Sequence, residues 1–512
     1  MLRKKLARAV VMGLLGVLLV ISTVAGHDEV QVKEIEELVP PSIMPVYFLS
    51  GTDYEMGYQH GEQGAPYITL LKNMIAGKYL KKELSNTPEK RDVILKGFQV
   101  YLDEYAPYLV DYLKGMAAGV TDAGYPMTYA EALMCQTEWD TAAAYSAEPD
   151  YPAIVKDLPT EECSGWAAWG DTTVDGNLVF GMSADGTWGH QANMVVFPET
   201  GNSYVADGVI GYLGIGYYMN SKGVTIGLTA QGTKRPIDTQ YGLTWPLLMT
   251  HVARTANSAA EAAKMYQEIK TTRGTDFLIG DAKEGFVAEV TSAKVVIRAM
   301  GDHGEKDFIV ATNHFVDPEM QKLSKQKNYG NSWGRYDMLF SYLRNNPGSV
   351  DAEFGKMMYR SRPVLRANRN VRIGEPAKLL TYTTAGSAHP YEGRGKSHFS
   401  ELTYSFYEIE LKETPEKVTL AAYSRAKKYL QMAHGQMTQI GYGDVRYAVL
   451  NPILSRAQEA HAIGINYKNS ATIATGNDAL YKWSKAMTAF TTAQALAMQV
   501  YQAFVPPLTN PW

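Results

Sequence analysis

The stretch "PTEECSGWAAWGDTTVDGNLVFGMSADG" occupies residues Pro159–Gly186 and contains Cys163, one of only two cysteines among the 512 residues. From Cys163 onward, "SGWAAWG" and "NLVFGMSAD" indicate two strands, and Asp175-Gly176 between them is a turn signal. A thiol in this position is half of a disulfide, a buried apolar residue or a nucleophile. The choice among these three decides what the protein does.

The chain before Cys163 is predicted to be mostly helical. Residues 27–45 are polar and acidic, end in prolines and are expected to form a linker. "VYFL" (46–49) predicts a short strand, and apolar residues recur at helical spacing through 55–146. Cys135 falls in the last of these helices beside Ala132 and Leu133, so it is expected to be a small buried residue.

The chain after Cys163 changes to short strands separated by turns. Helices interrupt these strands near 245–270, 332–344 and 350–359, and further strands follow. This order predicts an α+β layered domain over 163–410. Residues 411–512 become helical again, and we expect this C-terminal extension to pack on the main body or to form a homo-oligomer contact. A lipid- or acyl-contacting surface is the alternative for this extension.

The first 26 residues have the pattern of a secretory signal peptide. Basic residues at 3–8 precede a long apolar run, and small residues end it at Ala25-Gly26. An uncleaved membrane anchor is the alternative, because the run is long enough to span a bilayer. Either outcome predicts a body outside the cytoplasm. The net charge of −4 and the lack of a Lys/Arg cluster exclude nucleic acid as an expected partner.

Two cysteines are few for an exported chain that relies on disulfides. A Cys135–Cys163 bridge stays open, and the other interpretation is that one thiol is kept for chemistry. A thiol attacks as its thiolate and therefore needs a base, yet no histidine has a sequence context that marks it as a partner. If the chain were cut before Cys163, the new α-amine, with a pKa of roughly 7.7–8.0, would be such a base.

Four stretches together resemble the N-terminal nucleophile hydrolase superfamily, and most closely its acyl-coenzyme A:isopenicillin N acyltransferase family. They are "GTDYEMGYQHG" (51–61), "CSGWAAWGDTTVDGNLVFG" (163–181), "ATNHF" (311–315) and "NSWGRYDMLFSYL" (331–343). Each is weak alone, but the four in this order extend over about 290 residues. The resemblance covers residues 51 to about 410 and leaves out the signal peptide and the C-terminal extension.

The resemblance implies a four-layer αββα fold and assigns roles to four residues. Cys163 would be the nucleophile, freed by autoproteolysis after Glu162, so that 27–162 becomes a helical pro-segment or α-subunit. Asp185 would hold the amine of the nucleophile, because a carboxylate favours a nearby cation. Asn313 would help to bind the oxyanion through its side-chain NH₂. Arg335 would stabilise local charges or orient Asp185.

Two positions depart from the related bile salt and penicillin V hydrolases. Those relatives carry an arginine in a "GRN-D" pattern where this chain has Met182, and an asparagine after "GL" where it has Thr229. The contacts of that arginine are therefore lost or supplied from elsewhere. Methionine and threonine indicate a less charged pocket, so the substrates of those relatives do not transfer to this chain.

The sequence thus predicts an exported, self-processing cysteine hydrolase that cleaves a linear amide of an N-acylated small molecule. No cofactor and no metal are expected. Export favours water over an acceptor amine, because acyl-coenzyme A is a cytoplasmic donor. An acyltransferase of the same family, a phospholipase-B-like lipid acyl hydrolase and a non-catalytic exported binding protein are the alternatives.

Overall fold

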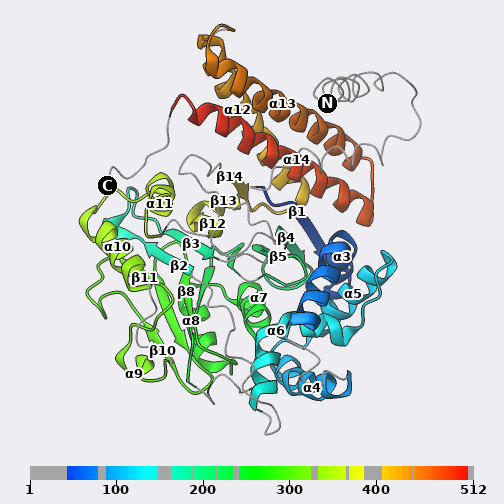
Figure 1. Cartoon of the computed structure of the whole chain (residues 1–512), viewed down its shortest axis with the longest axis vertical. Helices are drawn as coiled ribbons and strands as arrows, with labels where there is room; N and C mark the ends of the chain where they lie inside the picture. Colours follow the sequence, from blue (N-terminus) through cyan, green and yellow to red (C-terminus); the bar gives the residue numbers. More distant parts are fainter. Residues whose placement is uncertain are drawn as a thin grey trace, which may run out of the picture. The chain divides into compact units, whose positions relative to one another are not determined.

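Two β-sheets lie face to face in the computed structural model, which describes residues 43–78, 88–147, 163–185, 190–214, 216–234, 237, 241–324, 332–364, 368–385, 406–440 and 442–505 (Figure 1). The described residues belong to one compact unit, Pro40–Trp512. The signal-peptide prediction for 1–26 and the expected cut after Glu162 lie outside the described residues.

Among these residues, eight strands form sheet A and six form sheet B. In spatial order, sheet A holds β1 (Val46–Gly51), β4 (Gln191–Pro198), β5 (Tyr204–Val209), β6 (Tyr217–Asn220), β7 (Thr225–Ala230), β8 (Thr275–Gly280), β9 (Gly285–Val290) and β10 (Val295–Arg298). Sheet B holds β11 (Phe308–Ala311), β2 (Cys163–Ala168), β3 (Val179–Asp185), β12 (Asn368–Glu375), β13 (Leu380–Ala385) and β14 (Tyr407–Glu410). All neighbours pair antiparallel except β1 and β4.

The alternation of side chains along each strand builds the layers. In β3, Phe180, Met182 and Ala184 enter the core between the sheets, whereas Val179 enters a second core on the outer face of sheet B. That outer core is covered by α10 (Ser332–Asn345) and α11 (Ala352–Tyr359). The fold is therefore the predicted αββα sandwich, because each sheet buries both faces.

Helices cover the outer face of sheet A, and they come both from before and from after Cys163 in the sequence. Helices before Cys163 share one core with helices after it. They are α3 (Asp53–Lys78), α4 (Pro88–Tyr105), α5 (Tyr108–Asp122) and α6 (Tyr129–Ala147), then α7 (Trp245–Thr255) and α8 (Ala259–Glu268). The region predicted as a separate pro-segment thus supplies both a helical layer and the edge strand β1.

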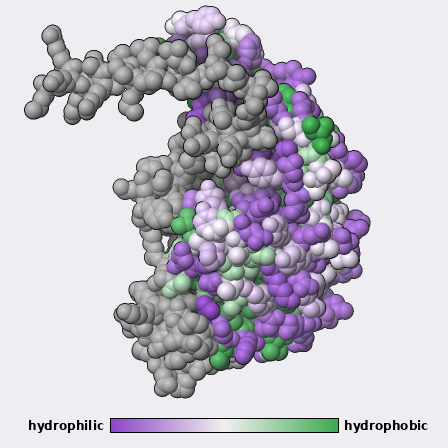
Figure 2. Space-filling model, turned by 90° about the vertical axis from the view of Figure 1, so that its right-hand side faces the viewer, coloured by the Kyte–Doolittle hydropathy of each residue, from purple (hydrophilic) through white to green (hydrophobic). Residues whose placement is uncertain are grey.

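The C-terminal extension forms three long helices, as its periodicity predicts. They are α12 (Pro415–Ile440), α13 (Val445–Ala471) and α14 (Gly476–Gln502) (Figure 1). Within the described part of the chain, no helix combines the length and apolar character needed to cross a membrane. Among the residues coloured by hydropathy in Figure 2, hydrophilic ones predominate and apolar ones form small separate spots.

Helix α14 covers an edge of each sheet. Ser484 and Thr488 accept hydrogen bonds from the outward N–H groups of Phe48 and Val46 in β1, at 2.9 Å each. On sheet B, the side chain of Gln494 accepts from Glu408 N in β14 at 3.1 Å. Two strand residues span about 6.6 Å, and four helical residues span about 6 Å. This match lets hydroxyls one turn apart replace a missing neighbouring strand, which otherwise leaves an edge open to aggregation.

Replacing Thr488 by valine is expected to lower the free energy of unfolding by about 1–3 kcal/mol, because Val46 N–H then stays buried without its acceptor. The exposed Thr438 of α12, replaced in the same way, is the matched control and is expected to change stability by less than about 0.5 kcal/mol. Urea denaturation measures both. Equal losses in the two variants would contradict this role of α14.

Candidate active site

Cys163 is the first residue of β2, the strand between β11 and β3 in sheet B. It pairs with Ala184 of β3 and is 1% exposed. Cys135 lies on α6, and no disulfide joins the two thiols. The disulfide interpretation of the two cysteines is therefore not realised in this structure.

The amide of Asn313 contacts the backbone nitrogen of Cys163. Asn313 follows β11 by two residues, and its Oδ1 accepts from Cys163 N at 2.6 Å. Its Nδ2 donates to the carbonyl of Ala230 at the end of β7, at 2.9 Å. This second bond orients the amide, so that its oxygen faces the Cys163 nitrogen. Oxyanion binding by the Asn313 NH₂ would use the second Nδ2–H, which does not bond to Ala230. This role stays a prediction.

Arg335 binds the same backbone from the helical side. It lies on α10, is fully buried, and donates through Nη1 to the carbonyl oxygen of Cys163 and, at 2.8 Å, to Ser164 Oγ. Its Nη2 donates to Asn313 Oδ1 at 2.8 Å. The planar guanidinium can reach three acceptors at once, which a lysine ammonium on a flexible stem does less well. Cys163, Asn313 and Arg335 are therefore in direct contact.

Asp185 ends β3, one residue beyond the partner of Cys163, and is 3% exposed. The charge of Asp185 acts electrostatically on Tyr359 of α11. Burial, and then the charges of Asp185 and Cys163, raise the pKa of Tyr359 well above its usual range. The Tyr359 hydroxyl donates to the Ser164 carbonyl at 2.9 Å. Asp185 thus lies near the Cys163 backbone, and its predicted role on the amine stays a prediction.

Two contacts at this site had no signal in the sequence. Ser164 follows Cys163 and gives Arg335 an acceptor, whereas Tyr359 lies on a helix 195 residues after Ser164 in the sequence. A lone tyrosine in an amphipathic helix is usually a core residue, so no pattern could mark Tyr359. Only the packing of α11 against sheet B brings it to Ser164.

The two departures from the related hydrolases have structural consequences. Met182 is buried between the sheets. Its sulfur lies close to the position that a Cβ atom would take if Gly165 or Gly227 were replaced by a larger residue. Opposite Met182 on β12, Arg372 forms a buried ion pair with Asp207 of β5 at 2.8 Å. An arginine is therefore present beside this position, but its charge is matched by a carboxylate of sheet A.

Thr229 uses its hydroxyl within the protein. Its Oγ1 donates to the carbonyl oxygen of Thr312, directly before Asn313, at 2.7 Å. Neighbouring His314 contacts Thr312 and Ser332 and stacks on Trp333 with 3.6 Å between ring centroids. Burial, and then the charges of Arg298 and Arg335, lower the pKa of His314 to about 3. His314 is therefore neutral at pH 7.

The described residues contain no group of three or more His, Cys, Asp or Glu side chains placed to hold a metal ion. Backbone and amide groups dominate the contacts around Cys163. The site is thus built to hold the nitrogen and carbonyl of one residue in fixed positions.

Comparison with known proteins agrees with the resemblance inferred from the four motifs. A family model described as "Acyl-coenzyme A:6-aminopenicillanic acid acyl-transferase" matches residues 191–370. This range includes Asn313 and Arg335 and begins after Cys163 and Asp185. The chain therefore resembles this acyltransferase family, and the match confirms the family resemblance that the sequence indicates.

Two similar proteins extend this comparison. A protein of Archaeoglobus fulgidus, described as uncharacterized, is 26% identical over 342 residues, which cover 60% of this chain and 56% of the relative. The chain thus spans little more than half the length of that relative. A crystal structure of a mutant conjugated bile acid hydrolase from Clostridium perfringens is 14% identical, with a TM-score of 0.34, and covers 49% of this chain and 98% of its own.

Proposed function

We propose that this protein is a self-processing cysteine amidohydrolase of the N-terminal nucleophile type, with Cys163 as nucleophile. The observation that carries the proposal is the pair of contacts on the Cys163 backbone. Asn313 Oδ1 accepts from its nitrogen, and Arg335 donates to its carbonyl. A thiol that needed only a side-chain base would gain little from these contacts, whereas an α-amine that serves as base must be held in place.

Self-processing would begin with attack of the Cys163 thiolate on the carbonyl carbon of Glu162. The new C–S bond replaces the C–N bond, the nitrogen takes up a proton, and water then hydrolyses the thioester to a carboxylate and a thiol. The freed amine has a pKa of roughly 7.7–8.0, which is close to working pH, so part of it is present as the neutral base. The nearby Arg335 charge favours the neutral amine and the thiolate, because it repels an ammonium and attracts S⁻.

The proposed reaction on substrate follows the same steps. The thiolate attacks the carbonyl of a linear N-acyl amide, the amine of Cys163 protonates the leaving nitrogen, and water hydrolyses the acyl-enzyme. We propose an exported, extracytoplasmic protein whose N-terminal segment is a cleaved signal or an anchor. Transfer of the acyl group to an amine is the second candidate, favoured by the description of the matched family. Contact with lipid and self-association of the chain are further proposals.

Intact mass and N-terminal sequencing of wild type and of Cys163→Ala test this proposal. Wild type is expected to give two fragments, the second beginning at Cys163, and Cys163→Ala a single uncleaved chain. Anilides of acetic, hexanoic and hexadecanoic acid then probe amide hydrolysis, with an added amine to detect acyl transfer. An intact wild-type chain would refute self-processing, and a cleaved Cys163→Ala chain would point to an external protease.

A further inference from the structure

A row of buried polar side chains crosses the inter-sheet face of sheet A beneath the segment that carries Asn313. The register of β7, β8 and β9 places Thr229, Asp276 and Glu289 side by side, and Arg298 of β10 follows diagonally. All four are at most 1% exposed. Such a row is costly to bury, so each member needs partners that its own strands do not supply.

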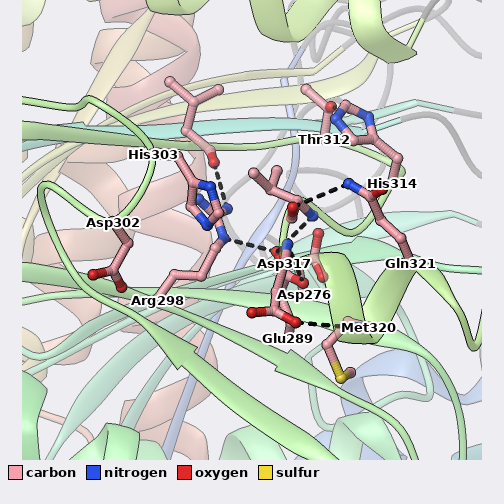
Figure 3. A network of polar contacts seen from close by, with 12 residues as sticks. Asp276, Glu289, Arg298, Asp302, His303, Thr312, His314, Asp317, Met320 and Gln321 are labelled. Atoms are coloured by element: carbon pink, nitrogen blue, oxygen red, sulfur yellow. Dashed lines mark hydrogen bonds and ion pairs between the residues drawn. The ribbon is translucent and has the colours of Figure 1, made fainter.

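These side chains bind backbone groups of residues 310–317, which we call the Asn313 segment. Figure 3 shows Arg298 and Glu289 directed toward it. Arg298 Nη2 donates to the carbonyl of Val310 at 2.8 Å. Glu289 accepts from Val316 N at 2.8 Å and, through its other oxygen, from Asp317 N at 3.1 Å. Both ends of the segment are therefore held by one ion pair, whose Nε and Oε1 atoms lie 2.7 Å apart.

The middle of the Asn313 segment is held by neutral donors. Thr229 Oγ1 and Gln231 Nε2 both donate to the carbonyl of Thr312, each at 2.7 Å. Gln231 Nε2 also donates to Asp276 Oδ2 at 2.6 Å. Burial, and then the charge of Glu289, raise the pKa of Asp276 well above its usual range. Burial also raises the pKa of Glu289, while the charge of Arg298 and the N–H groups of Val316 and Asp317 act to lower it.

We infer that Glu289, with Arg298 and Gln231, is a positioning residue for catalysis, acting through the Asn313 segment on the Cys163 amine. This inference rests on the proposed function of Cys163. The chain of contacts runs from Glu289 to the backbone at 316–317, along the segment to Asn313, and from Asn313 Oδ1 to Cys163 N and Arg335. Loosening the segment would release the Asn313 oxygen and with it one partner of Arg335.

A matched pair of carboxylates separates positioning from stability. Glu289 and Glu305 both pair with Arg298, at 2.7 and 3.3 Å, and both are buried. Glu305 also accepts from His303 N at 2.8 Å, outside the Asn313 segment. Glu289→Gln and Glu305→Gln therefore disturb the same arginine, and only the first removes an acceptor from the segment.

The test measures Cys163 alkylation by iodoacetamide between pH 5 and 10, with peptide mapping to separate it from Cys135. In Glu289→Gln the pH midpoint of Cys163 alkylation is expected to rise by about one unit. The reason is that Arg335, having lost its Asn313 partner, is held less closely to Cys163 and stabilises the thiolate less. Hydrolysis of the best anilide probe is expected to lose ~10–100-fold in kcat, with KM within about twofold. Glu305→Gln is expected to keep the wild-type midpoint. Gln231→Met removes the donor to the Thr312 carbonyl and to Asp276 Oδ2 but leaves Thr229 and Glu289 on the Asn313 segment, so a smaller shift in the same direction is expected.

Equal alkylation midpoints in Glu289→Gln and Glu305→Gln would overturn the inference. So would a loss of kcat that, across the variants, is proportional to the loss in the free energy of unfolding. If Glu289→Gln does not fold, the alkylation midpoint of Gln231→Met is compared with that of Glu305→Gln instead, and equal midpoints again overturn the inference. Failure of the proposed function has a different signature, because wild type itself would then remain uncleaved and inactive on every probe. A cleaved, active wild type with an unshifted Glu289→Gln refutes the positioning role alone.

Discussion

Replacement of Arg335 by methionine is expected to lower amide hydrolysis by about 10²–10³-fold and to leave most of the chain uncleaved. Arg335 is the one residue that contacts the Cys163 carbonyl, Ser164 and Asn313 together among the described contacts. Methionine keeps much of the volume but removes every donor. The Asn313 oxygen and the Cys163 carbonyl then stay buried with fewer partners.

Two further variants sharpen this prediction. Arg335→Lys keeps the charge but offers a point donor, so an intermediate loss of about 10-fold or more is expected. Arg344, exposed near the end of the same helix, provides the control, and Arg344→Met is expected to retain wild-type turnover. Anilide hydrolysis and the cleaved fraction by intact mass are the measurements. Turnover of Arg335→Met within threefold of wild type would rule out a role at the reacting centre.

Replacement of Gly115 by alanine is expected to lower the free energy of unfolding by about 3 kcal/mol or more. Helices α3 and α5 approach backbone to backbone at Gly57, Gly61, Gly115 and Gly119. A Cβ at Gly115 would lie 2.1 Å from the carbonyl oxygen of Tyr54, and one at Gly57 would lie 1.9 Å from that of Tyr112. Two helix backbones cannot separate locally without disturbing the core that they share with sheet A.

The control for this prediction is a helical glycine in open space. A Cβ at Gly435 of α12 would meet nothing within 4 Å, so Gly435→Ala is expected to be neutral or stabilising by up to about 1 kcal/mol. Denaturant unfolding of both variants measures the difference. Because α3 and α5 precede Cys163, Gly115→Ala is also expected to reduce the cleaved fraction. A loss of stability below about 1 kcal/mol would show that the helices can move apart.

Local patterns predicted most of the elements and the order of the layers. The alternation from Cys163 to Asp185 became β2 and β3, and the three C-terminal helices lie where their periodicity placed them. The same patterns could not show that residues 46–51 join sheet A beside β4, because strand pairing depends on residues about 150 positions apart. They also gave no reason to expect that α14 would cover the edges of both sheets.

Residue types and their order determined the candidate nucleophile, its family resemblance and three neighbours worth testing. Tertiary structure decided how those neighbours are used. It turned the Asn313 oxygen toward the Cys163 nitrogen, brought Tyr359 to Ser164, and placed Glu289 and Arg298 beneath the Asn313 segment. The physical reason is that side-chain alternation and helical periodicity are local, whereas the partner of a buried polar group is chosen by packing of distant strands. A sequence can therefore indicate a candidate nucleophile, but only the fold shows which atoms contact it.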